Sequence, residues 1–438
     1  MEWLINNIFS YLDWSVYEVH RMDLWALLGV YASFLMIDGP RYILTKIIML
    51  FHDVAVELGG KLDCEKQEAL AYQPRVSIIC PGKDEREHIT GTIESLLAQD
   101  YPDFEIIVID DGSSDDTWGV LEPYIEHPQV KLFRRQIAGG KSSAANMGLK
   151  LADPKSEVIV IVDSDSSYHK NAISEIIAPF KDPKVGGVSG NIRAKNWDEN
   201  LITRFQAADY LHSVSLGRRF TSWAGTLAIC SGAFGAFRKS LVEAVGGWDV
   251  GPGEDGDLTI KMRKIGYDIR FAPHATCFTD VPNSWRGWWK QRRRWNRGLI
   301  RYKMRKHFDM AIPGSDSYSF TNMLVILDVF FLRIFLNYSF FFYFTTAILF
   351  APAYSPLILS LTFMGYFFSN CLQMAIQLYY SEEPLEDLKI LSASLIMYPY
   401  RLGQRIIRLI SVTEEIFARR SYRDPYVPSR VGEATIHW

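Results

Sequence analysis

Two aspartates that stand two positions apart, Asp163 and Asp165, follow an apolar run near the middle of the chain. The run, Val158 to Val162, is rich in β-branched residues and predicts a strand buried on both faces of a parallel sheet. Ligands of open α/β sheets bind beyond the carboxyl ends of the strands. Because side chains alternate along an extended chain, both carboxylates can face one crevice, where they would suit Mg²⁺ or Mn²⁺. A turn with two solvated aspartates is the alternative.

Polar clusters follow two other predicted strands. Lys83-Asp84-Glu85 comes after the strand predicted at 76–80, and Asp110-Asp111 comes after the strand predicted at 104–109. Predicted helices alternate with these strands, which indicates a parallel sheet with right-handed crossovers. Polar clusters at the carboxyl ends of such strands predict a nucleotide-binding crevice.

A glycine pair with a lysine, Gly139-Gly140-Lys141, opens a predicted helix of small residues. It is not a P-loop, because Arg135 stands where the first glycine of that motif belongs. Backbone amides at a helix N-terminus, together with Lys141, could still hold a diphosphate.

A second acidic group, Glu254, Asp255 and Asp257, lies at the start of another predicted helix. Acids at this position can simply complement the helix dipole. They can also serve as a general base if one of them is exposed in the crevice. The preceding stretch at 231–238, SGAFGAFR, is small and flexible enough to lie flat against a ligand.

Residues 285–306 contain ten Lys or Arg and no Asp or Glu. Tryptophans recur along one helical stripe, and Gln291, Arg294 and Trp295 share a face at spacings of three and four. A basic helix with a tryptophan stripe predicts a helix at a membrane surface. Nucleic-acid binding is the competing interpretation, and the apolar segments elsewhere in the chain disfavour it.

Apolar residues concentrate toward both ends of the 438-residue chain, whose net charge is −3. Residues 3–17 predict an interfacial helix, and residues 22–42 predict a membrane helix or, alternatively, a buried soluble one. No secretory signal peptide is expected. Further on, 320–337 predicts a second interfacial helix, and 338–350 and 356–379 predict membrane crossings. Residues 388–410 could cross the membrane or lie in its interface, because three arginines occupy the second half.

The chain therefore divides into five predicted units. They are an N-terminal membrane region with a linker at 1–73, a cytosolic catalytic domain at 74–284, amphipathic interfacial helices at 285–337, transmembrane helices at 338–417 and a basic tail at 418–438. The five cysteines show no CxxC spacing, which favours reduced thiols and argues against structural zinc.

In combination, these motifs resemble the membrane-integrated, processive members of family 2 of the inverting glycosyltransferases. Those are the synthases of cellulose, hyaluronan, chitin and poly-N-acetylglucosamine. The resemblance covers roughly residues 75–310 and rests on four elements in order: Asp110-Asp111, Asp163-x-Asp165, Glu254-Asp255 and Gln291-x-x-Arg294-Trp295. It implies an α/β GT-A nucleotide-sugar domain with a mostly parallel sheet, combined with transmembrane and interfacial helices.

The resemblance also implies roles for individual residues. Asp110 or Asp111 would contact the uridine of a UDP-sugar, Lys141 its phosphate, Asp163 the donor, and Asp163 with Asp165 the Mg²⁺ or Mn²⁺ ion. Asp255, beside Glu254, would be the general base. Gln291, Arg294 and Trp295 would flank the diphosphate and the acceptor. Two departures leave the donor's identity open: Gly253 replaces a usual Thr, and Lys83-Asp84 replaces a usual aromatic–Asn pair.

The implied activity is transfer of sugar from a UDP-sugar to the growing end of a β-linked polysaccharide, in a processive reaction coupled to export. The implied location is the inner or plasma membrane, with several crossings and a cytosolic catalytic domain. Besides the lipid bilayer, a homo-oligomer or accessory export proteins are compatible partners. A non-processive enzyme making a glycolipid or a polyprenyl-phosphate sugar is the alternative, and a non-catalytic nucleotide-binding membrane protein is a third interpretation.

Overall fold

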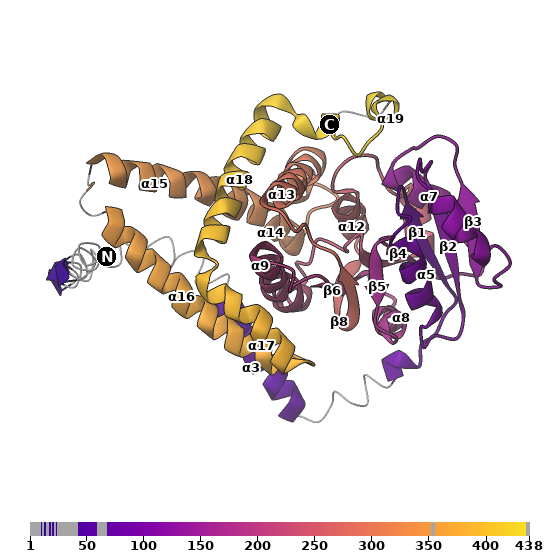
Figure 1. The fold of residues 1–438 in the computed structure, drawn as a ribbon, viewed down its shortest axis with the longest axis horizontal. Coiled ribbons are helices and arrows are strands. Elements are labelled where there is room, and N and C mark those ends of the chain that lie inside the picture. The colour runs from indigo at the N-terminus through magenta and orange to yellow at the C-terminus, as the bar shows by residue number, and fades with distance from the viewer. Residues whose placement is uncertain are drawn as a thin grey trace.

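The computed structural model describes residues 43–58, 68–350 and 355–434 continuously, with isolated positions between 10 and 23 and at 352. The interfacial and membrane helices expected over 3–17 and 22–42 fall outside these continuous ranges. The described chain has an α/β part built on one sheet and a helical part from which two long helices project (Figure 1).

Eight strands form the sheet, in the spatial order β3-β2-β1-β4-β7-β6-β8-β5. In chain order their bounds are β1 Val76–Gly82, β2 Phe104–Asp110, β3 Val130–Arg134, β4 Val158–Val162, β5 Ser166–Tyr168, β6 Val185–Ala194, β7 Phe234–Arg238 and β8 Asp268–Thr279. Strands β1 to β4 are mutually parallel, as expected. Beyond β4, the pairs β4–β7, β6–β7 and β5–β8 are antiparallel and β6–β8 is parallel, so the sheet as a whole is mixed.

Alternation along the central strands divides the core into two layers. In β4, Val158, Val160 and Val162 belong to one buried cluster, whereas Ile159 and Ile161 belong to the other. This is the period-two pattern of a strand covered on both faces. Apolar side chains on both faces hold the sheet rigid and leave the carboxyl ends of its strands to carry the polar side chains.

Helices cover both faces of the sheet. Buried side chains of α5 (Ile89–Leu97) and α8 (Ala172–Ile177) join the first cluster, and those of α7 (Lys141–Leu151), α11 (Lys239–Ala244) and α12 (Glu254–Lys264) join the second. The other helices of this part are α6 (Thr117–Leu121), α9 (Leu201–Tyr210), the π-helix η5 (Leu211–Leu216) and α10 (Gly217–Trp223). Helices α7 and α12 start at the predicted site residues Lys141 and Glu254.

The basic segment forms helix α13 (Trp285–Leu299), which continues as the π-helix η6 (Ile300–Lys306). Helix α18 (Tyr398–Ala418) packs along it, and Trp288 Nε1 donates a hydrogen bond to the Tyr400 hydroxyl at 3.0 Å. Glu414 of α18 pairs with Arg293 and Arg297. Much of the charge on this basic segment is therefore compensated inside the protein, and Trp288 is buried rather than part of an exposed stripe.

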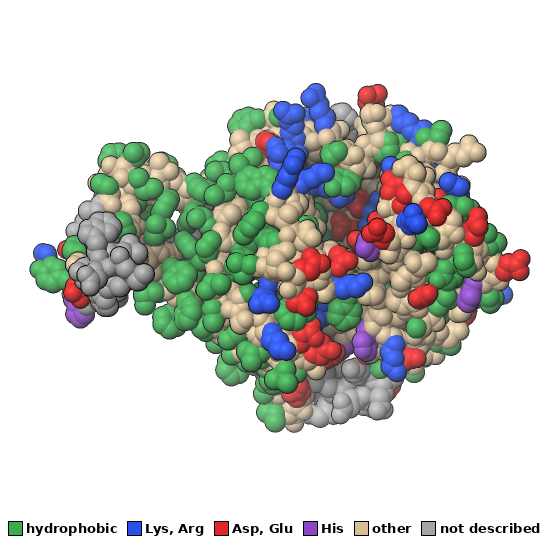
Figure 2. Space-filling model, viewed as in Figure 1, with side chains coloured by type: hydrophobic (Ala, Val, Ile, Leu, Met, Phe, Trp, Pro, Cys, Tyr) green, Lys and Arg blue, Asp and Glu red, His purple; other side chains and the backbone are tan. Residues whose placement is uncertain are grey.

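In the part of the chain that the structure describes, two helical segments are long and apolar enough to cross a membrane by length and composition, Phe320–Phe350 and Ser355–Tyr379. The first runs through α14 (Phe320–Asp328), the π-helix η8 (Val329–Phe335) and α15 (Leu336–Phe350), so the separate helix expected at 320–337 is part of one continuous segment. The second is α16. Hydrophobic side chains dominate the surface where these helices project (Figure 2).

Residues 388–410 are not one helix, which removes their interpretation as a single crossing. Helix α17 (Pro384–Ser392) and a short 3₁₀ turn end before α18 begins at Tyr398, with Pro399 in the first turn. Proline suits the start of a helix because its missing N–H has no intrahelical acceptor there. Arg401 and Arg405 of α18 donate to Asn370 and Tyr366 of α16 at 2.9 and 2.8 Å.

Candidate active site

A lysine and an aspartate meet at the carboxyl end of β4. Lys141, the first residue of α7, forms an ion pair with Asp163, and its Nζ also donates to the carbonyl of Gly232 at 3.3 Å. Burial disfavours the charged ammonium, but attraction by Asp163, Glu254 and Asp255 raises the pKa of Lys141 well above its usual range. A permanent positive charge is thus fixed beside Asp163.

Gly232 links this pair to the second acidic group. Its backbone N–H donates to Asp255 Oδ2 at 3.0 Å, and Asp255 Oδ1 accepts from the N–H of Gly256 at 2.7 Å. Burial and the neighbouring Asp255 raise the pKa of Glu254 above its usual value, against the opposing effect of Lys141. The acids predicted for donor binding and for base catalysis therefore face one another across the glycine of the SGAFGAFR stretch.

Asp165 and Glu85 add two carboxyl groups to the same edge of the sheet. Burial and the charge of Asp163 raise the pKa of Asp165. Burial and both aspartates raise the pKa of Glu85 to about 7. Glu85 was not among the predicted site residues, although its place in the polar cluster after β1 was a signal for it.

The electrostatics of this edge fit a divalent cation. Glu85, Asp163 and Asp165 carry hard oxygen ligands, and burial together with repulsion by neighbouring aspartates raises the pKa values of Glu85 and Asp165. A cation would relieve this repulsion. Within the described residues no group of three or more His, Cys, Asp or Glu side chains is placed so that it could hold a metal ion by itself. An ion here would therefore complete its coordination with water or with phosphate oxygens of a ligand.

The two aspartates after β2 are held inside the protein. Asp110 is fully buried and accepts from the Ser113 N–H at 2.9 Å. The carboxylate of Asp111 accepts from the N–H groups of Gly139 and Gly140, at 2.7 Å from the latter, and pairs with Arg135 at 2.9 Å. The glycine amides predicted to hold a diphosphate are therefore already occupied by Asp111.

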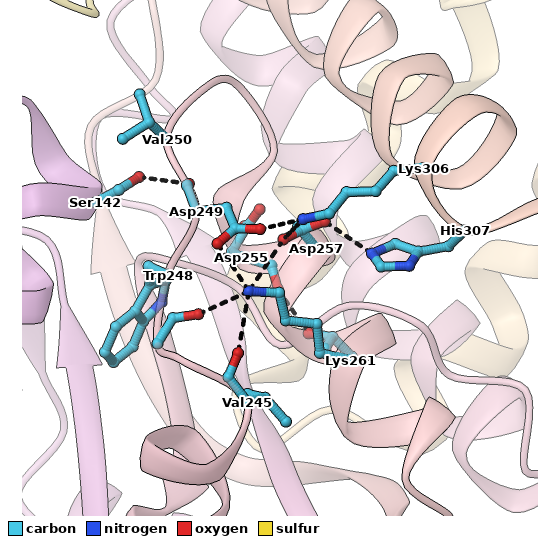
Figure 3. A network of polar contacts seen from close by, with 12 residues as sticks. Ser142, Val245, Trp248, Asp249, Val250, Asp255, Asp257, Lys261, Lys306 and His307 are labelled. Atoms are coloured by element: carbon cyan, nitrogen blue, oxygen red, sulfur yellow. Dashed lines mark hydrogen bonds and ion pairs between the residues drawn. The ribbon is translucent and has the colours of Figure 1, made fainter. Parts of the chain in front are cut away.

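Asp257, the third acid at the start of α12, is buried and contacts other residues than Glu254 and Asp255 do (Figure 3). Its carboxylate accepts from Lys306 Nζ at 2.7 Å and contacts His307 Nε2 at 2.9 Å. Burial alone would favour the neutral acid, but these hydrogen bonds and charges hold the pKa of Asp257 at about 2. Such a carboxylate is a poor proton acceptor, which leaves Asp255 and Glu254 as the candidates for a base.

The three residues predicted on α13 occupy different surroundings. Trp295 is 44% exposed, whereas Gln291 has a buried amide oxygen without a hydrogen-bond partner among the described residues. Arg294 lies near enough to Glu254 to oppose the rise in its pKa. Arg294 Nε is also 3.3 Å from Asp424 Oδ2, and its guanidinium lies over the ring of Tyr426.

The C-terminal tail thus borders the site. Besides Asp424 and Tyr426, it brings Arg430, which donates to the carbonyl of Ala138 at 2.6 Å, and Pro428, which lies beside Gly140. No pattern in the sequence indicated these contacts, because they join segments that are far apart in the chain. In Figure 2, acidic side chains line a hollow between the helical part and the α/β part.

Residues 77–246, which include Lys141, both aspartate pairs and Gly232, match the family model described as glycosyl transferase family 2. Poly-beta-1,6-N-acetyl-D-glucosamine synthases of Staphylococcus epidermidis and Staphylococcus aureus (strain COL) are similar to this chain, with 33% identity over 225 residues and 34% over 227 residues. Each alignment covers 51% of this chain and 54% of the relative, so the chain spans about half the length of these curated relatives.

A solved structure shares the fold. The mannosyltransferase PcManGT from Pyrobaculum calidifontis, in complex with GDP-Man and Mn²⁺, superposes with a TM-score of 0.55 over 85% of this chain and 99% of its own. The sequence identity is 20%, so the likeness concerns the fold alone. The chain accordingly has a GT-A-like glycosyltransferase fold, as the resemblance implied, and its sheet is mixed where a mostly parallel one was expected.

Proposed function

We propose that the protein is a membrane-bound inverting glycosyltransferase that transfers sugar from a nucleotide-sugar, with UDP as the expected nucleotide, to the growing end of a β-linked polysaccharide. The observation that carries the proposal is the continuous set of contacts Asp163–Lys141–Gly232–Asp255. It joins acids suited to a donor and its metal to an acid suited to deprotonating an acceptor. The relatives that synthesise poly-β-1,6-N-acetylglucosamine support a hexosamine polymer as product.

In this mechanism Asp255 acts as the general base. An acceptor hydroxyl attacks the anomeric carbon of the donor sugar while its proton passes to the Asp255 carboxylate. The bond between the anomeric carbon and the β-phosphate oxygen breaks, and the nucleoside diphosphate leaves with the bonding electron pair. The Gly232 N–H, which binds Asp255 Oδ2, orients the carboxylate and leaves its second oxygen near the start of α12.

The leaving diphosphate requires positive charge. Lys141 supplies a fixed ammonium beside Asp163, and Arg294 could offer a planar fork for phosphate once it parts from Asp424. Asp163 and Asp165, with Glu85 beside them, are the residues that would hold Mg²⁺ or Mn²⁺. A bound divalent ion would neutralise the diphosphate as it leaves. Trp295, partly exposed, suits stacking against the apolar face of a sugar.

The donor and the product can be established together. Purified full-length protein would be incubated with a panel of UDP- and GDP-sugars, and the products separated by size. The proposal predicts a polymer from one UDP-sugar, with UDP-N-acetylglucosamine as the first candidate. Single-sugar transfer to a lipid would favour the non-processive alternative, and binding of nucleotide without any transfer would refute the enzymatic proposal.

We also propose that the protein spans the inner or plasma membrane with its glycosyltransferase domain in the cytosol. Segments Phe320–Phe350 and Ser355–Tyr379 support this by length and composition, and the basic C-terminal tail suits the cytosolic side. A reporter fused near residue 150 or residue 310 should behave as cytosolic. An exported reporter at either position would contradict this topology.

A further inference from the structure

The start of α12 carries Glu254 and Asp255 and packs directly against the π-helix η6. We call this segment, residues 253–257, the acidic turn. A Cβ added at Gly253 would lie 2.8 Å from Tyr302 Cδ1, and one added at Gly256 would lie 2.4 Å from Tyr302 Cζ. Both distances are shorter than any real Cβ contact, so the tyrosine ring packs against bare backbone on either side of the two acids. Glycine at these positions therefore permits a close contact between the acidic turn and η6.

Ion pairs lie beside this contact, one turn further along η6. Lys306, four residues after Tyr302, donates to Asp257 at 2.7 Å and also pairs with Asp249 (Figure 3). His307 contacts the other oxygen of Asp257 at 2.9 Å. The side chains of Lys306, His307 and Asp257 are 8%, 5% and 6% exposed, so the ion pairs are poorly screened by water and their geometry is closely defined.

The same network reaches α7, which begins with Lys141. Lys261 of α12 binds Asp249 Oδ1 at 2.9 Å, and the carbonyl of Asp249 accepts from the Ser142 hydroxyl at 3.0 Å. Trp248 precedes Asp249 in the loop, and the Asn146 side chain of α7 forms hydrogen bonds with both its N–H and its carbonyl. One connected set of contacts, buried at Asp257 and partly exposed at Asp249, therefore joins the three elements that carry Lys141, Asp255 and Arg294.

We infer that Tyr302, Lys306 and Asp257 are positioning residues, which hold the acidic turn at a fixed distance from α13 and from the start of α7. Among the described residues, their contacts do not reach the β4 edge where Asp163 and Asp165 lie, so they would act through Asp255 and Lys141. The kinetic effects expected from this inference rest on the proposed function. Since a misplacement of about 1 Å can cost about 100-fold in rate, loss of the network should affect turnover more than donor binding.

The test compares two lysines that each pair with an aspartate, one in the buried network and one at a partly exposed ion pair. Lys306→Met removes the pairing with Asp257 at the acidic turn. Lys264→Met removes the pairing with Asp309 at the other end of α12, where Lys264 Nζ and Asp309 Oδ2 are 2.7 Å apart. With full-length protein, Lys306→Met should lower kcat about 10- to 100-fold, with donor KM changed less than about threefold. Lys264→Met should leave both constants near wild type, and Lys306→Arg should recover part of kcat.

Amide hydrogen exchange provides a readout that needs no activity. Lys306→Met should speed exchange at residues 253–257 and at the start of α7, and Lys264→Met should not. If Lys306→Met fails to fold, Tyr302→Leu tests the contact between η6 and the acidic turn without leaving a buried charge unpaired. This variant should show the same loss of kcat and the same faster exchange. Unchanged kcat with unchanged exchange, or parallel losses of folding, donor binding and turnover, would overturn the inference. Wild-type protein that transfers no sugar would refute the proposed function instead, while the exchange result would still decide whether the network holds the turn.

Discussion

Two acidic groups of this protein, which come from distant parts of the sequence, differ in how their charge is compensated. At the end of β4, Lys141 pairs with Asp163, and burial with repulsion by neighbouring aspartates raises the pKa values of Asp165 and the nearby Glu85. In the network below the acidic turn, Asp249 and Asp257 face Lys261 and Lys306, and the pKa of Asp257 is lowered.

This difference separates residues that bind and react from residues that position. Carboxylates whose negative charge is not compensated have affinity for a cation and for a ligand that brings one. In a balanced network each charge is already paired within the protein, so such a network does not bind a further charge. Asp255 stands between the two groups. It shares its turn with Asp257, but its hydrogen bonds lead to Gly232 and so to Lys141 and Asp163.

Removal of divalent cations should have the largest effect, because the β4 acids would then repel the donor diphosphate. EDTA should reduce transfer to background, and Mg²⁺ or Mn²⁺ should restore it. In Asp163→Ala the added metal should not restore activity, and a fluorescent nucleotide should show weakened donor binding. Full sugar transfer in the presence of chelator would show that the acids at the end of β4 do not act through a divalent cation.

Restoring the more usual threonine before the two acids should have the next largest effect. Gly253 has φ +84°, where a threonine costs about 1–3 kcal/mol, and Gly253→Thr would also collide with Tyr302. We expect a lower Tm and at least about a tenfold loss of turnover.

Gly266→Thr is the matched control for this change. Gly266 has φ +89° and nothing within 4 Å of an added Cβ, so this variant carries the backbone strain without the collision. It should lower Tm by a similar or smaller amount and leave turnover per folded molecule unchanged. Equal turnover losses in both variants would show that the contact with Tyr302 has no special importance.

The smallest expected effect is on the pH dependence of stability. The pKa of Asp257 is about 2 in the folded protein against an ordinary 3.8, so its ionisation stabilises the fold above pH ~4, and this contribution is lost as pH falls toward 2. About 1.4 kcal/mol per pKa unit gives an upper figure of roughly 2–3 kcal/mol. The Tm difference between wild type and Asp257→Asn should therefore narrow between pH 5 and pH 2. A constant difference would show that Asp257 is not held ionised by its partners.

The strands and their terminal acids were predictable because their signals are local. The β-branched run Val158–Val162 has the bounds it was predicted to have, and Lys141 and Glu254 open helices as expected. The pairing of Asp424 with Arg294 and of Lys306 with Asp257 was not predictable, because each joins distant segments through one ion pair. For the same reason, ten basic residues indicated a surface helix, while tertiary packing turned many of them toward internal carboxylates.

The most direct test compares Asp255→Asn with Asp257→Asn, two changes of identical chemistry two positions apart. Turnover at saturating donor, donor affinity by calorimetry and Tm would be measured for both. Asp255→Asn should lose about 10²–10⁴-fold in transfer while keeping donor affinity and Tm, because only the proton acceptor is gone. Asp257→Asn should instead lower Tm, since a buried lysine loses its partner, and should cost less in turnover. Near wild-type transfer by Asp255→Asn, or a larger loss of transfer in Asp257→Asn at unchanged Tm, would contradict the division between a reacting and a positioning group.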